Sequence, residues 1–176
     1  YWGFMDSGVV PDIVTMGKPL GDGHPLAAVV TTPAIAADFA KVSGYFNTFG
    51  GNPVSAAVGK AVLEVVERDK LLAHVKSTGD YLFDGLNGLA ERHDIIGEIR
   101  GKGLFAAIEL VTDRASKAPA TAETAGVVES MREAGVLVSS IGRDDNIIKI
   151  RPPLVFGRQH ADIVLAALDE SLRAAR

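Results

Sequence analysis

A single lysine in a glycine-rich loop between two apolar strands constrains this chain more than any other feature. Lys18 stands in the letters GKPLGDGHP, and the flanking segments 12–16 and 27–32 are rich in β-branched and apolar residues. Glycines let a backbone approach a ligand closely, and ligands gather at the carboxyl ends of strands in α/β proteins. An amine placed there can form a Schiff base with a carbonyl compound, and a solvated surface lysine is the ordinary alternative.

A second stretch, NTFGGNPVSAAVG, joins a turn to the start of a helix. Asn52 is a good capping residue, Pro53 suits the first helical position, and apolar residues then recur at helical spacing. Thr48 and two glycines lie directly before this helix start. Backbone N–H groups and the positive end of the helix dipole favour an anion there, such as phosphate. A plain turn followed by a helix cap is the alternative.

Composition narrows the classes of function. The net charge of −4 gives no basic surface for nucleic acid, and no apolar run is long enough to predict a membrane span. The chain has no cysteine, which excludes disulfides and thiolate metal sites and fits a cytoplasmic protein. Its four histidines show no metal-ligand spacing, so we expect no metal. The Lys18 loop matches neither a P-loop nor a dinucleotide fingerprint.

The pattern of the chain changes near residue 72. Residues 1–72 resemble part of a larger α/β domain, and the opening at Tyr1 reads as mid-domain, so we expect a fragment. Residues 73–176 predict a small α+β domain with helices on one face of a mostly antiparallel sheet. Its expected strands are 95–100, 104–111, 136–140 and 147–151, and its expected later helices are 121–134 and 160–174.

Four stretches together resemble the class III family of pyridoxal-phosphate-dependent aminotransferases, which has the fold-type I architecture. They are PDIVTMGKPLGDGHPLAAVV, YFNTFGGNPVSAAVG, IRGKGLFAAIEL and IKIRPPLVF, in the family's order and across nearly the whole chain. The resemblance implies an α/β fold in which 1–72 is the C-terminal portion of the cofactor-binding large domain. It further implies that 73–176 is the small C-terminal domain.

The resemblance also implies roles for two residues. Lys18 matches the lysine that holds pyridoxal phosphate as an internal aldimine and moves a proton between substrate and cofactor. Thr48 matches the threonine that binds the cofactor phosphate of the neighbouring subunit, which implies a homodimer with a shared site. The family's acidic partner of the ring nitrogen, its Gly-rich phosphate loop and its ring-stacking aromatic all lie upstream of the first residue.

One position departs from the family's transaminases, which often carry a carboxylate-binding arginine three residues before the proline pair. Lys149 stands there, and the arginine is Arg151, which directly precedes Pro152. Both are candidate substrate-binding residues, although lysine cannot give the bidentate fork of arginine. His24 has either a substrate role or only structural hydrogen bonds. Arg100 either faces the site or pairs locally, and it is assigned no role.

The sequence therefore predicts an enzyme that transfers an amino group between a small amine or amino acid and a 2-oxo acid. The GDGHP and KIRPPLVF letters look most like a branch with phospholyases and alanine–glyoxylate aminotransferase-like enzymes. The alternative in chemistry is thus a phospholyase acting on phosphoethanolamine or phosphohydroxylysine. The alternative of another class is a catalytically silent binding or dimerisation module. The isolated chain is expected to bind the cofactor weakly and to be inactive.

Overall fold

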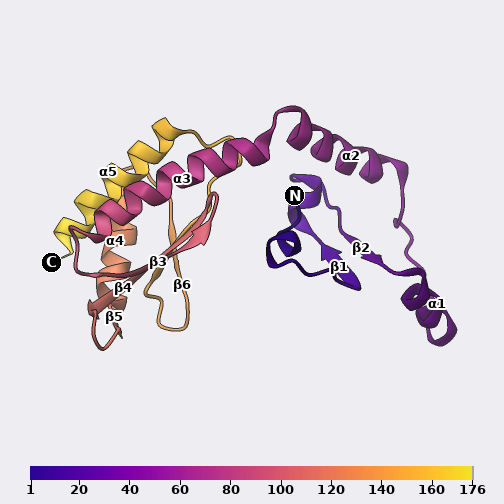
Figure 1. Cartoon of the computed structure of the whole chain (residues 1–176), viewed down its shortest axis with the longest axis horizontal. Helices are drawn as coiled ribbons and strands as arrows, with labels where there is room; N and C mark the ends of the chain where they lie inside the picture. Colours follow the sequence, from indigo (N-terminus) through magenta and orange to yellow (C-terminus); the bar gives the residue numbers. More distant parts are fainter. Residues whose placement is uncertain (176) are drawn as a thin grey trace. The chain divides into compact units, whose positions relative to one another are not determined.

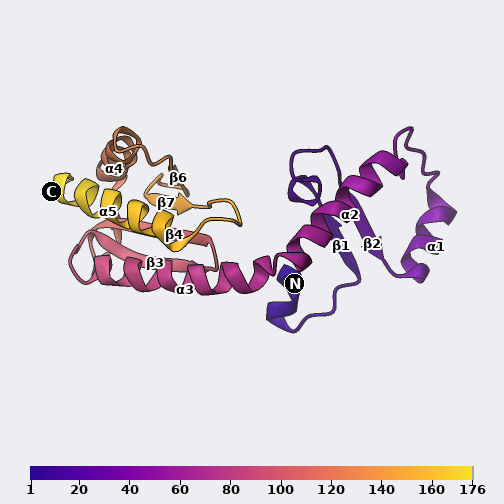
Figure 2. The same cartoon turned by 90° about the horizontal axis from the view of Figure 1, so that it is seen from above.

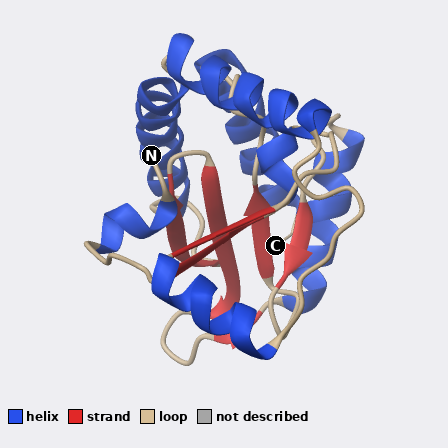
Figure 3. Ribbon diagram, turned by 90° about the vertical axis from the view of Figure 1, so that its right-hand side faces the viewer, coloured by secondary structure: helices blue, strands red, loops and turns tan. Residues whose placement is uncertain are grey.

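The computed structural model describes residues 1–175, which form two compact units (Figure 1). The first unit is Tyr1–Leu72, and the second begins at Ala73. Both units combine helices with antiparallel strands (Figure 3). None of the helices in this described part of the chain is both long and apolar enough to cross a membrane.

The first unit is built around a two-stranded ribbon. Its β1 and β2 pair antiparallel with Met16 opposite Ala28, so the Lys18 loop connects the two paired ends. Helix α2 begins after Asn52, whose side chain accepts a hydrogen bond from the backbone N–H of Ser55. The elements are the 3-10 helix η1 (Gly3–Ser7), β1 (Ile13–Met16), the 3-10 helix η2 (Lys18–Gly21), β2 (Ala28–Thr31), α1 (Pro33–Val42) and α2 (Pro53–Arg68).

This unit has almost no core of its own. Only Gly21 and Gly59 are buried, whereas Val10 is 92% exposed and Phe46 is 87% exposed. Apolar burial is the main favourable contribution to folding, and large exposed apolar surfaces mark contacts with other protein. The first unit therefore needs further protein surface to cover it.

The second unit is a four-stranded antiparallel sheet with a short added strand. The strand order is β3-β4-β7-β6, and β5 pairs with the far end of β4. Helix α3 starts at the boundary between the units and continues through this one. The elements are α3 (Leu71–Ala90), β3 (Ile96–Lys102), β4 (Phe105–Asp113), β5 (Ala118–Pro119), α4 (Thr121–Glu133), β6 (Ser139–Ile141), β7 (Ile147–Ile150) and α5 (Arg158–Ala174).

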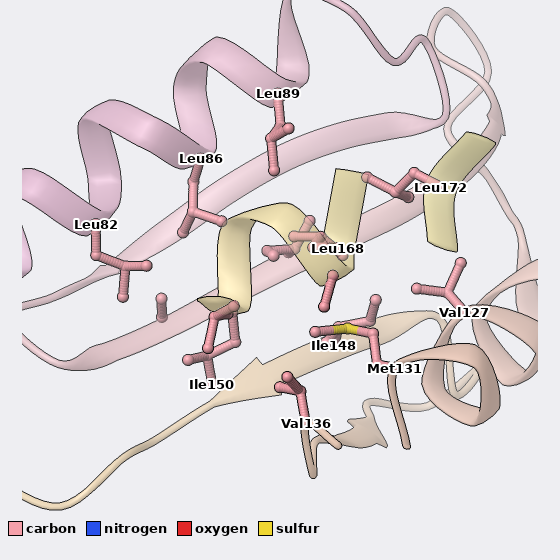
Figure 4. Close-up of a cluster of buried hydrophobic side chains, with 14 of the residues drawn as sticks. Leu82, Leu86, Leu89, Val127, Met131, Val136, Ile148, Ile150, Leu168 and Leu172 are labelled. Atoms are coloured by element: carbon pink, nitrogen blue, oxygen red, sulfur yellow. The ribbon is translucent and has the colours of Figure 1, made fainter. Parts of the chain in front are cut away.

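The core of the second unit lies on one face of this sheet. Alternate residues of β4 and β7, such as Ile108 and Ile148, are fully buried and belong to one core cluster with residues of α3, α4 and α5. Figure 4 shows Ile148 of β7 together with residues of these helices, such as Leu86 and Leu168. Helices α3 and α5 lie side by side (Figure 2). Tyr81 of α3 bonds to Asp162 of α5, and His93, which follows the end of α3, bonds to Asp169 of α5. The predicted small antiparallel sheet with helices on one face is confirmed.

The structure differs from the predicted elements at two strands. The apolar run starting at Val136 was expected to pair from its first residue, but β6 begins only at Ser139. Val136 is buried instead, and its N–H donates to the carbonyl of Met131 at the end of α4. Strand β7 ends at Ile150, so Arg151 lies just outside the sheet. An apolar run predicts burial, but whether it pairs depends on a neighbour far along the chain.

Candidate active site

Lys18 lies where β1 gives way to the 3-10 helix η2, and it is the first residue of that helix. The preceding Gly17 is extended, with φ −141° and ψ −156°, and its carbonyl accepts a hydrogen bond from the N–H of Leu20 at 2.9 Å. The Lys18 side chain is exposed. An accessible amine at this position can form a Schiff base with a carbonyl compound.

Thr48 lies in a loop that two asparagines hold at either end. The side chain of Asn47 accepts a hydrogen bond from the N–H of Phe49 at 3.1 Å, and Asn52 donates to the carbonyl of Phe49 at 2.8 Å. Gly51 has a φ of +70°, a left-handed conformation that favours glycine. Thr48 is exposed in the turn that leads to the Asn52 cap of α2, and backbone N–H groups at a helix N-terminus favour an anion.

The end of the Lys18 loop and the start of α2 both line an open hollow of about 770 Å³. Its polar lining comes from both segments, whereas Lys18 and Thr48 themselves are not among the residues that line it. The lining residues include His24, Asn47, Gly50, Gly51, Asn52 and Ser55.

His24 joins the two segments by a side-chain hydrogen bond. Its Nε2 lies 2.8 Å from the hydroxyl of Ser55, in the first turn of α2. Asn52 donates to the same hydroxyl at 3.1 Å. The three side chains are partly buried and form one network. Sequence reasoning found the Asn52 cap and considered His24, but it gave Ser55 no role, since its partner lies 31 residues away.

Lys149 and Arg151 lie in the second unit. Lys149 is half-buried in β7, opposite Ala107 on one side and Ser139 on the other, on the sheet face away from the helices. Arg151 is exposed and lines an apolar hollow of about 480 Å³ together with Pro153 and His160. Lys149 does not line this hollow. Both cations fall in the predicted strand 147–151, but β7 ends between them.

Arg100 pairs locally in the structure. It lies opposite Ala107 on β3, and its guanidinium donates to Glu109 at 2.6 Å and to Glu98 at 3.0 Å. It thus shares the outer face of the sheet with Lys149, one strand apart from it. Two carboxylates already satisfy this arginine, which agrees with giving it no role in the site.

Comparisons with known proteins identify the family. A family model described as "Aminotransferase class-III" matches residues 1–172. The chain belongs to this family. It is 50% identical over 172 residues to "Alanine--glyoxylate aminotransferase 2 homolog 2, mitochondrial" from Arabidopsis thaliana, covering 98% of this chain and 36% of that protein.

Two solved structures place the family's fold on this chain. A phospholyase from Arthrobacter in complex with phosphoethanolamine matches with a TM-score of 0.93 and 47% identity, over 98% of this chain and 41% of that one. An amine transaminase from an uncultivated Pseudomonas species, in its PLP-bound internal aldimine form, matches with a TM-score of 0.88 and 33% identity, over 99% and 41%. The chain therefore spans well under half the length of these relatives and has part of their fold.

The first unit offers the types of chemical group that can bind pyridoxal phosphate. An aldehyde that carries a phosphate needs an amine for its carbonyl carbon and N–H or O–H donors for its phosphate. Lys18 offers the accessible amine, and Thr48 with the glycine-containing turn before α2 offers the donors.

Proposed function

We propose that this chain forms part of a pyridoxal-phosphate-dependent enzyme that transfers an amino group from a small amine or amino acid to a 2-oxo acid. The observation that carries the proposal is the position of Lys18, an accessible amine at the carboxyl end of β1 in a chain of the class III family. We propose Lys18 as the residue that binds the cofactor covalently.

Lys18 and Thr48 have different roles in the proposed reaction. When bound, pyridoxal phosphate supplies an electron sink for the bond that breaks at the substrate carbon. The freed ε-amine of Lys18 removes the proton from that carbon and later returns one. The hydroxyl of Thr48 donates to the cofactor phosphate in the neighbouring subunit, so the proposed enzyme is a homodimer with a shared site.

A phospholyase is the second candidate. It is favoured by the match to the Arthrobacter phospholyase, which is 47% identical and was solved with phosphoethanolamine. Lys149 also favours a phospholyase, because it stands where transaminases of the family often carry a carboxylate-binding arginine. A lysine can bind a phosphate as a compact point charge. In that reaction a phosphate leaves from the carbon next to the one that Lys18 deprotonates.

The cellular location stays a prediction. A cysteine-free chain fits the cytoplasm, whereas the Arabidopsis relative carries "mitochondrial" in its name. We further propose that the isolated chain binds the cofactor weakly and has no turnover. Its first unit buries only two glycines, so the surfaces that complete the site must come from elsewhere.

Borohydride reduction of the cofactor-loaded complete protein, followed by peptide mapping, tests the proposal. The pyridoxyl label is expected on Lys18, and Lys18→Ala should abolish turnover. A label on Lys41 or Lys60 would overturn the assignment, and no label at all would favour a silent module. Amino transfer from alanine to glyoxylate, measured beside phosphate release from phosphoethanolamine, then separates the two candidate reactions.

A further inference from the structure

A continuous series of turns fixes His24 relative to Lys18. The N–H of Leu20 donates to Gly17 at 2.9 Å, that of Asp22 to Pro19 at 3.2 Å, and that of His24 to Gly21 at 3.0 Å. Each turn begins inside the previous one, so the backbone from Gly17 to His24 has little freedom. A displacement of His24 is therefore transmitted to the residue that precedes Lys18.

A second series of bonds fixes Ser55 relative to Thr48. The N–H of Ser55 donates to Asn52 at 2.9 Å, and the Asn52 side chain donates to the carbonyl of Phe49 at 2.8 Å. The N–H of Phe49 in turn donates to the side chain of Asn47 at 3.1 Å. Thr48 lies between these two bonded residues, so its position follows that of the first turn of α2.

The two series meet at one side-chain contact, the 2.8 Å hydrogen bond between His24 and Ser55. Close packing supports this contact. A β-carbon on Gly59 of α2 would lie 2.6 Å from Cδ2 of Leu26, and one on Gly21 would lie 3.1 Å from Cβ of Leu26. Gly21 and Gly59 are the only buried residues of the first unit. Helix α2 thus packs against Leu26 of the Lys18 loop at Gly59, with no room for a side chain there, and Gly21 packs against Leu26 within the loop.

We infer that His24 and Ser55 are positioning residues, whose hydrogen bond sets the Lys18 segment and the Thr48 segment relative to each other. This inference rests on the proposed function, in which Lys18 acts in one site and Thr48 in the site of the neighbouring subunit. The bond then links the two sites of the dimer through one chain. A cap that only stabilised α2 would need Asn52 alone, since Asn52 already accepts the N–H of Ser55.

The test compares four variants of the cofactor-loaded complete protein. His24→Leu and Ser55→Ala each remove the bond, and the double variant removes both partners. His24→Gln places an amide nitrogen near the position of Nε2 and keeps a donor for Ser55. Ser43→Ala, an exposed serine of the same unit, is the matched control. Thermal unfolding of each variant shows whether it folds.

Two measurements report separately on the Lys18 segment and on the Thr48 segment. The pH midpoint of the bound cofactor's absorbance band reports the Lys18 end, and the rate of cofactor loss on dialysis reports the Thr48 end. A net hydrogen-bond contribution of ordinary size predicts that each single variant loses the cofactor about three- to tenfold faster. The pH midpoint should shift in His24→Leu and in Ser55→Ala. The double variant should lose the cofactor no faster than the faster of the two single variants, and His24→Gln should resemble the wild type in both measurements.

Three results would overturn the inference. One is a folded His24→Leu or Ser55→Ala protein with unchanged midpoint and unchanged cofactor loss. Another is full additivity in the double variant, which would mean that the two side chains act separately. The third is a wild-type protein with no pyridoxyl label on Lys18, which removes the proposed function as well. A labelled wild type with unaffected variants therefore rejects the positioning role alone.

Discussion

A methyl group on Gly79 would lie 2.5 Å from the carbonyl oxygen of Gly103, so helix α3 touches the β3–β4 turn with no room for a side chain. Gly103 has a φ of +56°, which keeps its own backbone in a conformation that favours glycine. We predict that Gly79→Ala lowers the free energy of unfolding by about 1–3 kcal/mol, because backbone rather than a flexible side chain must move. Chemical denaturation measures the change.

Gly88→Ala on the same helix is the matched control. The nearest atom to a β-carbon there is Nη1 of Arg92 at 3.9 Å, an ordinary contact. Alanine is a better helix former than glycine, so this variant should gain up to about 1 kcal/mol. Equal effects of the two substitutions would show that the approach of Gly79 to Gly103 is not tight in solution.

Arg114 makes four hydrogen bonds to backbone carbonyls between the last residue of α3 and the first residue of β3. Its Nε donates to the carbonyls of Asp94 and Ile96, and its Nη2 donates to those of Ala90 and His93. Carbonyls at a helix C-terminus lack helical partners and carry partial negative charge, so a guanidinium satisfies both needs. We predict that Arg114→Ala lowers the free energy of unfolding by about 1–2 kcal/mol.

Arg132→Ala is the comparison for Arg114. Arg132 is an exposed arginine that pairs with Glu129 one turn earlier on α4. Such surface pairs contribute about 0–1 kcal/mol, so its loss should be small. If both variants unfold at the same denaturant concentration, the contacts of Arg114 to the backbone add nothing beyond a surface charge.

Asp169 makes the stability of the second unit depend on pH in the acid range. The hydrogen bond from His93 holds the pKa of the Asp169 carboxyl below its usual value, and the charges of Arg173 and Arg92 add to this, whereas burial opposes it. A lowered folded pKa means that ionised Asp169 adds stability above the ordinary aspartate pKa. That stability is lost as the pH falls through the folded pKa.

We therefore predict that Asp169→Asn makes unfolding less dependent on pH in the acid range and lowers stability at neutral pH. Denaturation midpoints measured from neutral to strongly acid pH give the slope. Asp38→Asn is the control, because Asp38 is exposed and forms a surface pair with Lys41. An unchanged acid slope in Asp169→Asn would exclude Asp169 as the group responsible.

Lys149 tests the phospholyase candidate. A charge-assisted bond to a phosphate contributes about 1.5–3 kcal/mol, so Lys149→Ala should lower kcat/KM for phosphoethanolamine about ten- to hundredfold. Amino transfer from alanine should change little, because a lysine cannot give the bidentate contact that an arginine makes with a carboxylate. Lys60→Ala, an exposed lysine on α2, is the control. Unchanged kinetics with both substrates would remove Lys149 from the site and leave the aminotransferase reaction.

Short-range patterns determined much of this protein. Capping by Asn52 and the proline after it start α2 at the predicted residue, because the cap bond joins residues three apart. The alternating apolar residues of β4 and β7 predicted a sheet with one buried face, since strand side chains alternate by geometry. Lys18 could be singled out because the glycines and apolar strands that mark it are its neighbours in the sequence. The resemblance of four stretches to one family predicted the family.

Contacts between distant residues were decided only by the tertiary structure. The bond from His24 to Ser55 spans 31 residues, and the pairing of Arg100 with Glu109 depends on the β3–β4 register. Strand β6 starts at Ser139 and β7 ends at Ile150, because a strand forms only where a neighbour offers free backbone groups. A local pattern does not show which distant segment packs beside it. Only the tertiary structure shows that Arg151 lines the apolar hollow and that Lys149, inside β7, does not.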